Sequence, residues 1–262
     1  MLICVDGTGS GFLLHTRNRA ANYAVEMMGS FVGMIYYGSR LPNRKYYQGP
    51  DSLGTGPNMV EPGLLCAQIT EFWRQGDHQV FMAGYSRGAA IVINTAAFLT
   101  YLDCRMPDGQ YAQVEAMFLF DAVDRSWDLH KTQSIPPNVK YCYHAMRDDR
   151  AHSRGSFSHC GTTMQGANTF LVKRNFYTTH GGMGGVPWGE TGFPKLNQDI
   201  QAEMRHMITP NAQAARSRVL LGSCIHEKFP DGTTNVTVDQ EKAGSKAVHD
   251  WMWPFLYKHK VL

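Results

Sequence analysis

The sequence of 262 residues is marked first by what it lacks. No apolar run approaches the length of a membrane span, and the first residues do not combine the charged and apolar regions of a secretory signal. The net charge of +3 is too small and too dispersed to indicate nucleic-acid binding. We therefore expect a cytoplasmic location by default and no nucleic-acid partner. Export by a signal-less route and the oligomeric state stay open.

The six cysteines show no C-x-x-C pair and are widely spaced. Cys4, Cys66 and Cys142 lie in apolar segments, where a free cysteine behaves as a small hydrophobic residue. A disulfide framework or a zinc site is therefore not expected. A reducing compartment is the default for such a chain.

No internal repeat and no linker divides the chain. Apolar runs predict strands at residues 1–5, 80–83, 115–120, 139–144 and 170–178. Helical spacing predicts helices at residues 20–37, 61–74, 88–103, 199–207 and 212–220, and breakers predict a long loop over 40–58. Alternating strands and helices predict one α/β domain over 1–262, in which a mostly parallel sheet is covered by helices on both faces. Residues 210–262 could form a C-terminal extension that packs on it.

One pentapeptide, Gly84-Tyr85-Ser86-Arg87-Gly88, carries the strongest functional signal. It is the only G-x-S-x-G match in the chain, and it lies between a strand-like run and a helix-like run. This order is typical of the nucleophile elbow of serine hydrolases, in which a sharp turn lifts the serine Oγ above the sheet edge. The motif therefore predicts that Ser86 attacks an acyl carbon.

A serine nucleophile needs a base, and the base needs an orienting carboxylate. In hydrolases with this elbow the acid and then the histidine follow the serine along the chain. Asp121 comes directly after the strand-like run Met117-Phe118-Leu119-Phe120, and we favour it over Asp124 in the same loop. Either carboxylate could instead serve a turn or a helix cap.

The predicted base is His180, which follows a strand-like run and precedes several glycines. His144 also ends a strand and is the main alternative. The charged residues 146–150 that follow it predict a salt-bridged structural segment. His152, His159 and His249 are expected to be solvated or capping residues.

Acyl transfer also needs donors for the developing oxyanion. The residue after the nucleophile usually supplies one backbone N–H, here that of Arg87. The glycine-rich loop that begins at Asp6 could supply the second, from Gly7 or Thr8. This loop lacks the lysine and the spacing of a phosphate-binding loop, so nucleotide binding is the weaker interpretation.

Six segments, in order along the chain, resemble one family. They are the Asp6-Gly7-Thr8 loop, Tyr46-Tyr47-Gln48-Gly49, the elbow with Arg87, Phe120-Asp121-Ala122-Val123, the stretch from Tyr143-His144 to Arg150, and His180 with Gly184-Gly185. Together they resemble the uncharacterised α/β-hydrolase family that includes bacterial type VI secretion phospholipase effectors. The resemblance covers residues 3 to about 190.

The resemblance implies an α/β-hydrolase-like fold, a Ser86–Asp121–His180 triad and a structural place for His144. It implies lipase-like or phospholipase-like ester hydrolysis, with no metal and no organic cofactor. Gly181-Gly182 replaces a Ser-Asp pair of the family, so one polar contact of the histidine loop is missing. The family's effectors also carry extra segments for membrane binding, so ester hydrolysis is expected before lipid as the substrate.

Alternatives in activity remain. A thioesterase or an amidase could use the same triad, and the glycines after His180 leave open a hydrolase-fold binding module without turnover. The C-terminal stretch 249–260 mixes aromatic and basic residues, as at a membrane interface. We favour a terminal helix that packs its aromatic side chains on the core.

Overall fold

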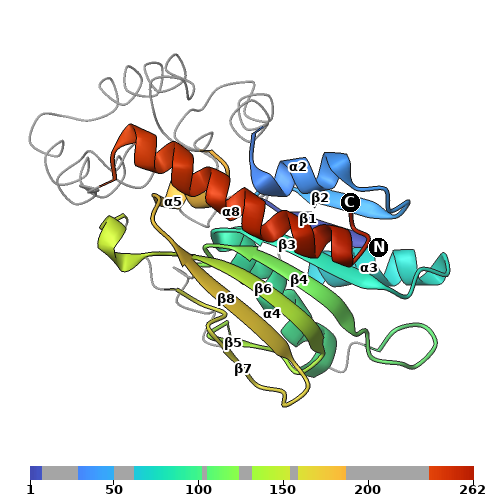
Figure 1. Ribbon diagram of the computed structural model, residues 1–262. Coiled ribbons are helices and arrows are strands. Elements are labelled where there is room, and N and C mark those ends of the chain that lie inside the picture. Colours follow the sequence, from blue (N-terminus) through green and yellow to red (C-terminus); the bar gives the residue numbers. More distant parts are fainter. Residues whose placement is uncertain (8–28, 50–61, 102–104, 124–131, 154–158, 187–235) are drawn as a thin grey trace, which may run out of the picture.

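The computed structural model describes residues 1–7, 29–49, 62–101, 105–123, 132–153, 159–186 and 236–262. Its centre is a sheet of six strands in the order β2-β1-β3-β4-β6-β8 (Figure 1). The strands are β1 (Leu2–Val5), β2 (Arg44–Tyr47), β3 (Val80–Tyr85), β4 (Val114–Phe120), β6 (Val139–Arg147) and β8 (Phe170–Phe176). Every neighbouring pair is parallel, so all six carboxyl ends meet at one edge of the sheet.

The central strands were predictable because they are buried on both faces and read as continuous apolar runs. β1 and β3 are buried throughout. The predicted loop over 40–58 is wrong at Arg44–Tyr47, which pairs with β1 as the edge strand β2. Its sequence Arg-Lys-Tyr-Tyr lacks an apolar run because an edge strand is only half covered.

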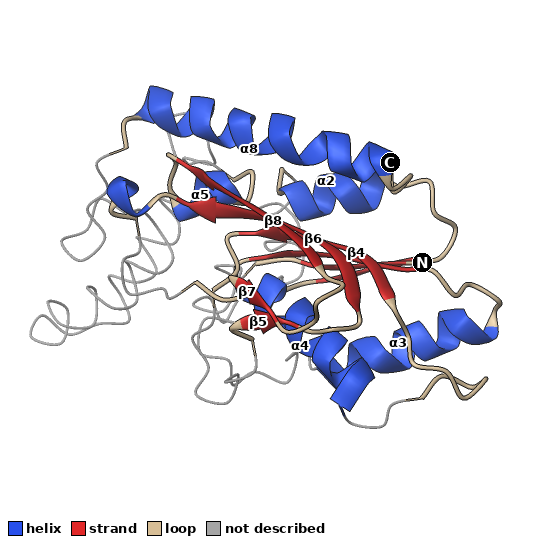
Figure 2. Cartoon of the chain, turned by 60° about the horizontal axis from the view of Figure 1, so that its bottom comes forward, coloured by secondary structure: helices blue, strands red, loops and turns tan. Residues whose placement is uncertain are grey.

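Helices cover both faces of the sheet (Figure 2). α3 (Pro62–Arg74) and α4 (Arg87–Tyr101) lie on one face, and α2 (Phe31–Gly38) and α8 (Val238–Lys258) lie on the other. Alternate residues of a strand point to opposite faces of the sheet. In β1, Ile3 and Val5 lie in the core beneath α3 and α4, while Leu2 and Cys4 lie in the core beneath α2 and α8.

Some element boundaries differ from the sequence-based expectation. The predicted helix over 20–37 does not run through Ser30, whose extended backbone and Oγ, accepting from Gly33 N–H, start α2 at Phe31. Two short strands, β5 (Ser134–Ile135) and β7 (Thr163–Met164), and the 3₁₀ turn η2 (Asp149–Ala151) were not expected. The helices predicted at 199–207 and 212–220 lie outside the described residues.

The C-terminal aromatic stretch belongs to α8 and packs on the sheet. Phe255 stacks on Tyr143 with ring centroids 4.0 Å apart, and Trp251 meets Phe176 edge-on at 5.6 Å. Most of these rings are therefore partly buried against the core. Peripheral membrane contact stays a prediction. Within the described part of the chain, no helix is long and apolar enough to cross a bilayer.

Candidate active site

The turn after β3 holds Ser86 in a left-handed conformation, with φ 56°. Such a φ is strained for a residue with a side chain and is typical of functional turns. Gly88 makes the turn possible, because a Cβ there would collide with the carbonyl oxygens of Val5 and Asp6. The elbow of β3 and α4 is thus packed directly against the end of β1.

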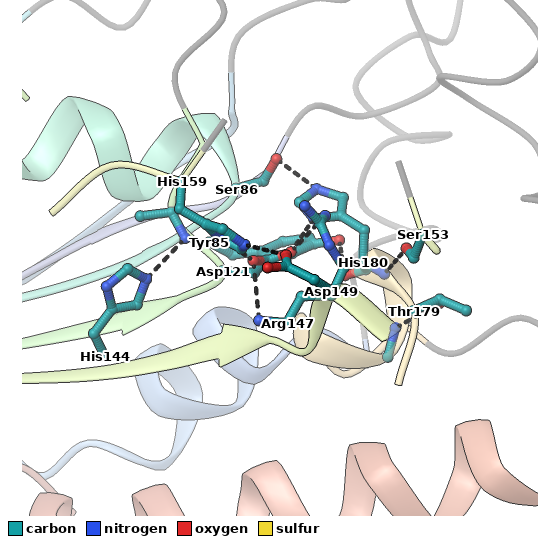
Figure 3. A network of polar contacts seen from close by, with 12 residues as sticks. Tyr85, Ser86, Asp121, His144, Arg147, Asp149, Ser153, His159, Thr179 and His180 are labelled. Atoms are coloured by element: carbon teal, nitrogen blue, oxygen red, sulfur yellow. Dashed lines mark hydrogen bonds and ion pairs between the residues drawn. The ribbon is translucent and has the colours of Figure 1, made fainter. Parts of the chain in front are cut away.

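The structure brings the three predicted triad residues together (Figure 3). Ser86 Oγ lies 2.8 Å from His180 Nε2, and His180 Nδ1 lies 2.6 Å from Asp121 Oδ2. A proton on Nδ1 lets His180 donate to Asp121 and accept from Ser86. All three residues are buried. The residues come from the ends of β3 and β4 and from the start of α5 (His180–Met183), at the carboxyl edge of the sheet.

Asp121 has two further basic neighbours that the sequence analysis placed elsewhere. Arg147 Nη1 donates to Asp121 Oδ2 at 3.0 Å, and Nδ1 of His159 lies 3.3 Å from Oδ1. Burial alone would raise the pKa of the Asp121 carboxyl, but Arg147, His159 and His180 hold this pKa well below its usual range. The carboxylate is therefore kept ionised inside the protein.

The prediction of a salt-bridged segment at 146–150 holds for Arg147, whose guanidinium forms a buried ion pair with Asp121 at the candidate site. β6 continues past His144 to Arg147, which carries this side chain to the carboxyl edge beside Asp121. The strand register was the missing signal, because Ala145 pairs with Phe120 and Arg147 lies two residues further on the same face. The rest of the segment behaves as expected: Arg150 and Asp148 form an exposed ion pair at 2.6 Å.

His144 lies apart from the triad, in a fully buried place beneath the Asp121 loop. Its Nδ1 lies 3.1 Å from Gly161 O, and its Nε2 accepts from the Ala122 N–H at 3.2 Å. Burial lowers the pKa of His144 to about 4. A neutral imidazole thus ties the loop after β4 to the loop that holds Gly161.

The backbone of His180 is held at both of its polar groups. Its N–H donates to Ser153 Oγ at 2.8 Å, and its carbonyl oxygen accepts from the Tyr85 hydroxyl at 2.9 Å. Tyr85 precedes Ser86, so one residue of the elbow also holds the backbone of His180. Neither Ser153 nor Tyr85 was singled out from the sequence, because both roles depend on contacts across the fold.

The predicted oxyanion donors have different outcomes. Arg87 is the first residue of α4 and directly follows Ser86, and its role as an oxyanion donor stays a prediction. Gly7 is corrected: its N–H donates to Asp6 Oδ1 at 2.8 Å, so this amide already has an acceptor. Thr8 lies outside the described residues, as does Asp124.

Asp6 itself is a buried anchor of this loop. Its Oδ2 accepts from Ser30 Oγ at 2.5 Å and from the Tyr46 hydroxyl at 2.7 Å. Desolvation raises the pKa of Asp6 to about 6, against the lowering effect of these hydrogen bonds and that from Gly7. The carboxyl group thereby joins β1, β2 and the start of α2 beside Ser86.

Gly182 departs from the family pattern for a steric reason. A Cβ at this position would collide with Thr178 Oγ1 and lie 2.8 Å from Glu241 Oε1. The Thr178 hydroxyl, with the Glu241 carboxylate beside it, therefore leaves no room for a side chain here. His180 keeps its contacts with Ser86 and Asp121 all the same.

The described cysteines, Cys4, Cys66, Cys142 and Cys160, are free and buried. Among the described residues, no group of three or more His, Cys, Asp or Glu side chains could hold a metal ion.

The parallel sheet, its two helical layers and the strand–elbow–helix turn decide the architecture. The chain has an α/β-hydrolase-like fold. In the sheet, β1 lies between β2 and β3. The chain passes from β1 to β2 on one side and then to β3 on the other side, so the strand order reverses between the neighbouring ends of β1 and β3. In open parallel sheets, ligands bind outside the carboxyl ends of the strands at such a reversal.

Comparisons with known proteins find only distant likenesses. No known family profile and no curated protein sequence matches the chain. It is similar to an uncharacterized protein from Pseudomonas aeruginosa, with 15% identity, a TM-score of 0.30, and 74% of this chain and 31% of that chain covered. It is also similar to a predicted CIB-like hydrolase from Thermoplasma acidophilum, with 12% identity, a TM-score of 0.31, and 79% and 85% covered. The chain thus spans about a third of the length of the first. Membership in the type VI effector family stays a prediction.

Proposed function

We propose that the chain is a serine hydrolase that cleaves carboxylic esters through an acyl-enzyme. The supporting observation is the continuous contact from Ser86 Oγ through the His180 ring to Asp121, at 2.8 and 2.6 Å. These distances lie within the range that proton transfer between nucleophile and base requires. They favour an enzyme over a binding module, which would tolerate a base out of reach of the serine.

In the first half-reaction, His180 Nε2 takes the proton of Ser86 as Oγ attacks the acyl carbon. The oxyanion receives the Arg87 N–H, and a second donor from the Asp6 loop remains a proposal for Thr8. Asp121 stabilises the imidazolium, which then protonates the leaving alcohol as the bond to it breaks. The products of this half are the alcohol and an ester of Ser86.

In the second half-reaction, His180 takes a proton from water, and the hydroxide oxygen attacks the acyl carbon. Collapse of the tetrahedral intermediate returns the proton to Ser86 Oγ and releases the carboxylic acid. Arg147 keeps the Asp121 carboxylate ionised throughout, so its charge is available when the imidazolium forms. The cycle consumes one ester and one water and needs no cofactor.

The finer substrate class we propose is a lipid ester, as in lipases and phospholipases, on the resemblance in sequence. A thioester or an amide would pass through the same steps, and a substrate panel separates the three. Treatment of a membrane lipid extract with wild type and with Ser86→Ala, followed by lipid mass spectrometry, tests the lipid proposal. Loss of a lipid class and gain of free fatty acid only with wild type would support it.

Ester hydrolysis by Ser86→Ala tests the reaction type. We expect kcat to fall by about 10⁴-fold or more, because the nucleophile is lost while the fold is kept. Ser134→Ala is the matched control, since Ser134 lies on β5 and contacts Thr163 at the surface. Full activity in Ser86→Ala on short and long acyl esters would overturn the proposal.

A further inference from the structure

A carboxylate with no exposed surface lies behind the segment that carries His180. It belongs to Glu241 in the first turn of α8, more than 60 residues further along the chain. Oε2 accepts from Thr178 Oγ1 and from the Thr179 N–H, both at 2.7 Å, and Oε1 accepts from Thr179 Oγ1 at 2.5 Å. The two residues before His180 are thus bound to one side chain of the C-terminal helix.

The helix start does not itself need Glu241. Thr237 and Gln240 form a reciprocal capping box, which gives partners to their two backbone N–H groups without Glu241. Burial of a carboxylate is costly unless it accepts good hydrogen bonds. In the described part of the chain, no Lys, Arg or His forms an ion pair with Glu241, so the donors of Thr178 and Thr179 offset this cost. The buried carboxylate therefore has its function at the His180 segment.

Two glycines show how closely α8 and this segment approach. Gly244 lies three residues after Glu241, on the same helix face, and a Cβ there would collide with the Tyr177 carbonyl oxygen. From the other side, a Cβ on Gly182 would lie 2.8 Å from Glu241 Oε1. The first turns of α8 are therefore fitted against the backbone on both sides of His180.

We propose that Glu241 is a positioning residue for the base of the proposed hydrolase, and that the C-terminal helix is part of the active-site support. Ser153 and Tyr85 hold the N–H and carbonyl of His180. Glu241 fixes the two preceding residues, which determine where the ring leaves the backbone. The inference rests on the proposed function, because placement of the ring matters only if His180 acts on Ser86.

Glu241→Ala is the direct test, with Met252→Ala as the matched control. Met252 is buried on the same helix, in the core beneath it, about three turns after Glu241. Both variants weaken the packing of α8, but only Glu241→Ala frees Thr178 and Thr179. Reaction rates with a fluorophosphonate are measured below the unfolding temperature of each variant, together with kcat and KM for an ester.

We expect Glu241→Ala to react with the fluorophosphonate about 100-fold more slowly than wild type, the loss that a displacement of about 1 Å can cause. The loss should fall on kcat rather than KM. The low-field proton NMR resonance of His180 Nδ1–H, which is hydrogen-bonded to Asp121, should weaken as well. Met252→Ala should keep the wild-type rate and resonance, and Glu241→Gln should recover part of the loss because it retains an acceptor for Thr179 N–H.

Equal rates in Glu241→Ala and wild type would overturn the role of Glu241, as would equal losses in Glu241→Ala and Met252→Ala. If Glu241→Ala does not fold, Glu241→Gln replaces it, and a wild-type rate and resonance in that variant would also overturn the role. Failure of the wild type itself to react with the fluorophosphonate would instead overturn the proposed serine chemistry. The two claims can therefore fail separately.

Discussion

At the scale of single residues, the Asp121 carboxylate lies at the centre of the polar contacts of the site. Its two oxygens meet His180, the Arg147 side chain and the Arg147 N–H, with His159 Nδ1 nearby. The carboxylate is fully buried, and Arg147 is almost so. A charge in such surroundings depends on its partners, because water contributes little to its stabilisation. The basicity of the whole triad is therefore linked to Arg147.

Arg147→Met should move the acid limb of the kcat/KM profile to higher pH. Loss of the guanidinium raises the pKa of Asp121 and favours a protonated His180, so activity is lost earlier as the pH falls. The variant should also lose about 3–5 kcal/mol of stability, because a buried carboxylate loses its partner. The pH–rate profile and urea unfolding measure the two effects.

Arg150→Met is the control for this change, since Arg150 forms an exposed pair with Asp148 away from the triad. Its pH profile should match that of the wild type. An Arg147→Met profile that also matches would show that the guanidinium does not act on the triad.

Asp6 and His144 are two buried groups whose contributions to the free energy of unfolding depend on pH in opposite directions. The pKa of Asp6 is raised to about 6, so its contribution is complete below about pH 4 and is lost as the pH rises through 6. The pKa of His144 is lowered to about 4, so its contribution is present above about 6.5 and is lost as the pH falls through 4. Between pH 4 and 6 the two dependences largely cancel.

Asp6→Asn should reveal the pH dependence of stability that comes from Asp6. Asparagine keeps an acceptor for the Gly7 N–H and carries no ionisable proton. From pH 4 to pH 7, wild type should lose about 3 kcal/mol of unfolding free energy relative to the variant, because the pKa of Asp6 rises by about two units on folding. Urea unfolding at several pH values measures this difference. A constant difference across the range would contradict the assignment.

At the scale of elements, the turn between β3 and α4 is tightly constrained by close packing. A Cβ on Gly88 would collide with the carbonyl oxygen of Val5, the last residue of β1, and with that of Asp6, the residue after it. The opening residues of the chain therefore help to form the elbow, although some 80 residues separate them in sequence.

Gly88→Ala should destabilise the protein and lower ester hydrolysis, because its methyl group would overlap the backbone of β1. Overpacking of this kind costs about 1–3 kcal/mol or more. Gly63→Ala is the control: Gly63 lies in α3, nothing lies within 4 Å of its added Cβ, and alanine favours the helix by up to about 1 kcal/mol. Thermal unfolding compares the two, and equal midpoints would contradict the packing at Gly88.

The sequence predicted elements best where one physical signal was sufficient. β3 and β4 were recognised because double-sided burial leaves an uninterrupted apolar run. β2 was missed because an edge strand of Arg-Lys-Tyr-Tyr carries no such run, and its pairing with β1 is decided by the fold. The predicted start of α2 was wrong because the prediction used apolar spacing alone and did not treat Ser30 as an N-cap.

At the scale of the whole molecule, the site collects residues from the carboxyl edge of the sheet and from the C-terminal helix. The chain order of Ser86, Asp121 and His180 was predictable because it is typical of sheets with this elbow and each residue follows a strand. Arg147, Ser153 and Glu241 were not, since their roles depend on which strands and helices become neighbours. Local pattern thus located the reacting groups, and tertiary packing supplied the groups that hold them.

The most direct measurement is covalent labelling of Ser86. Wild-type protein is incubated with a fluorophosphonate, and the intact mass and peptide map are recorded beside those of Ser86→Ala and His180→Ala. One adduct per chain is expected, on Ser86, with none in Ser86→Ala and very slow labelling in His180→Ala because the base is lost. An unlabelled wild type, or an adduct on another residue that persists in Ser86→Ala, would contradict the proposed nucleophile.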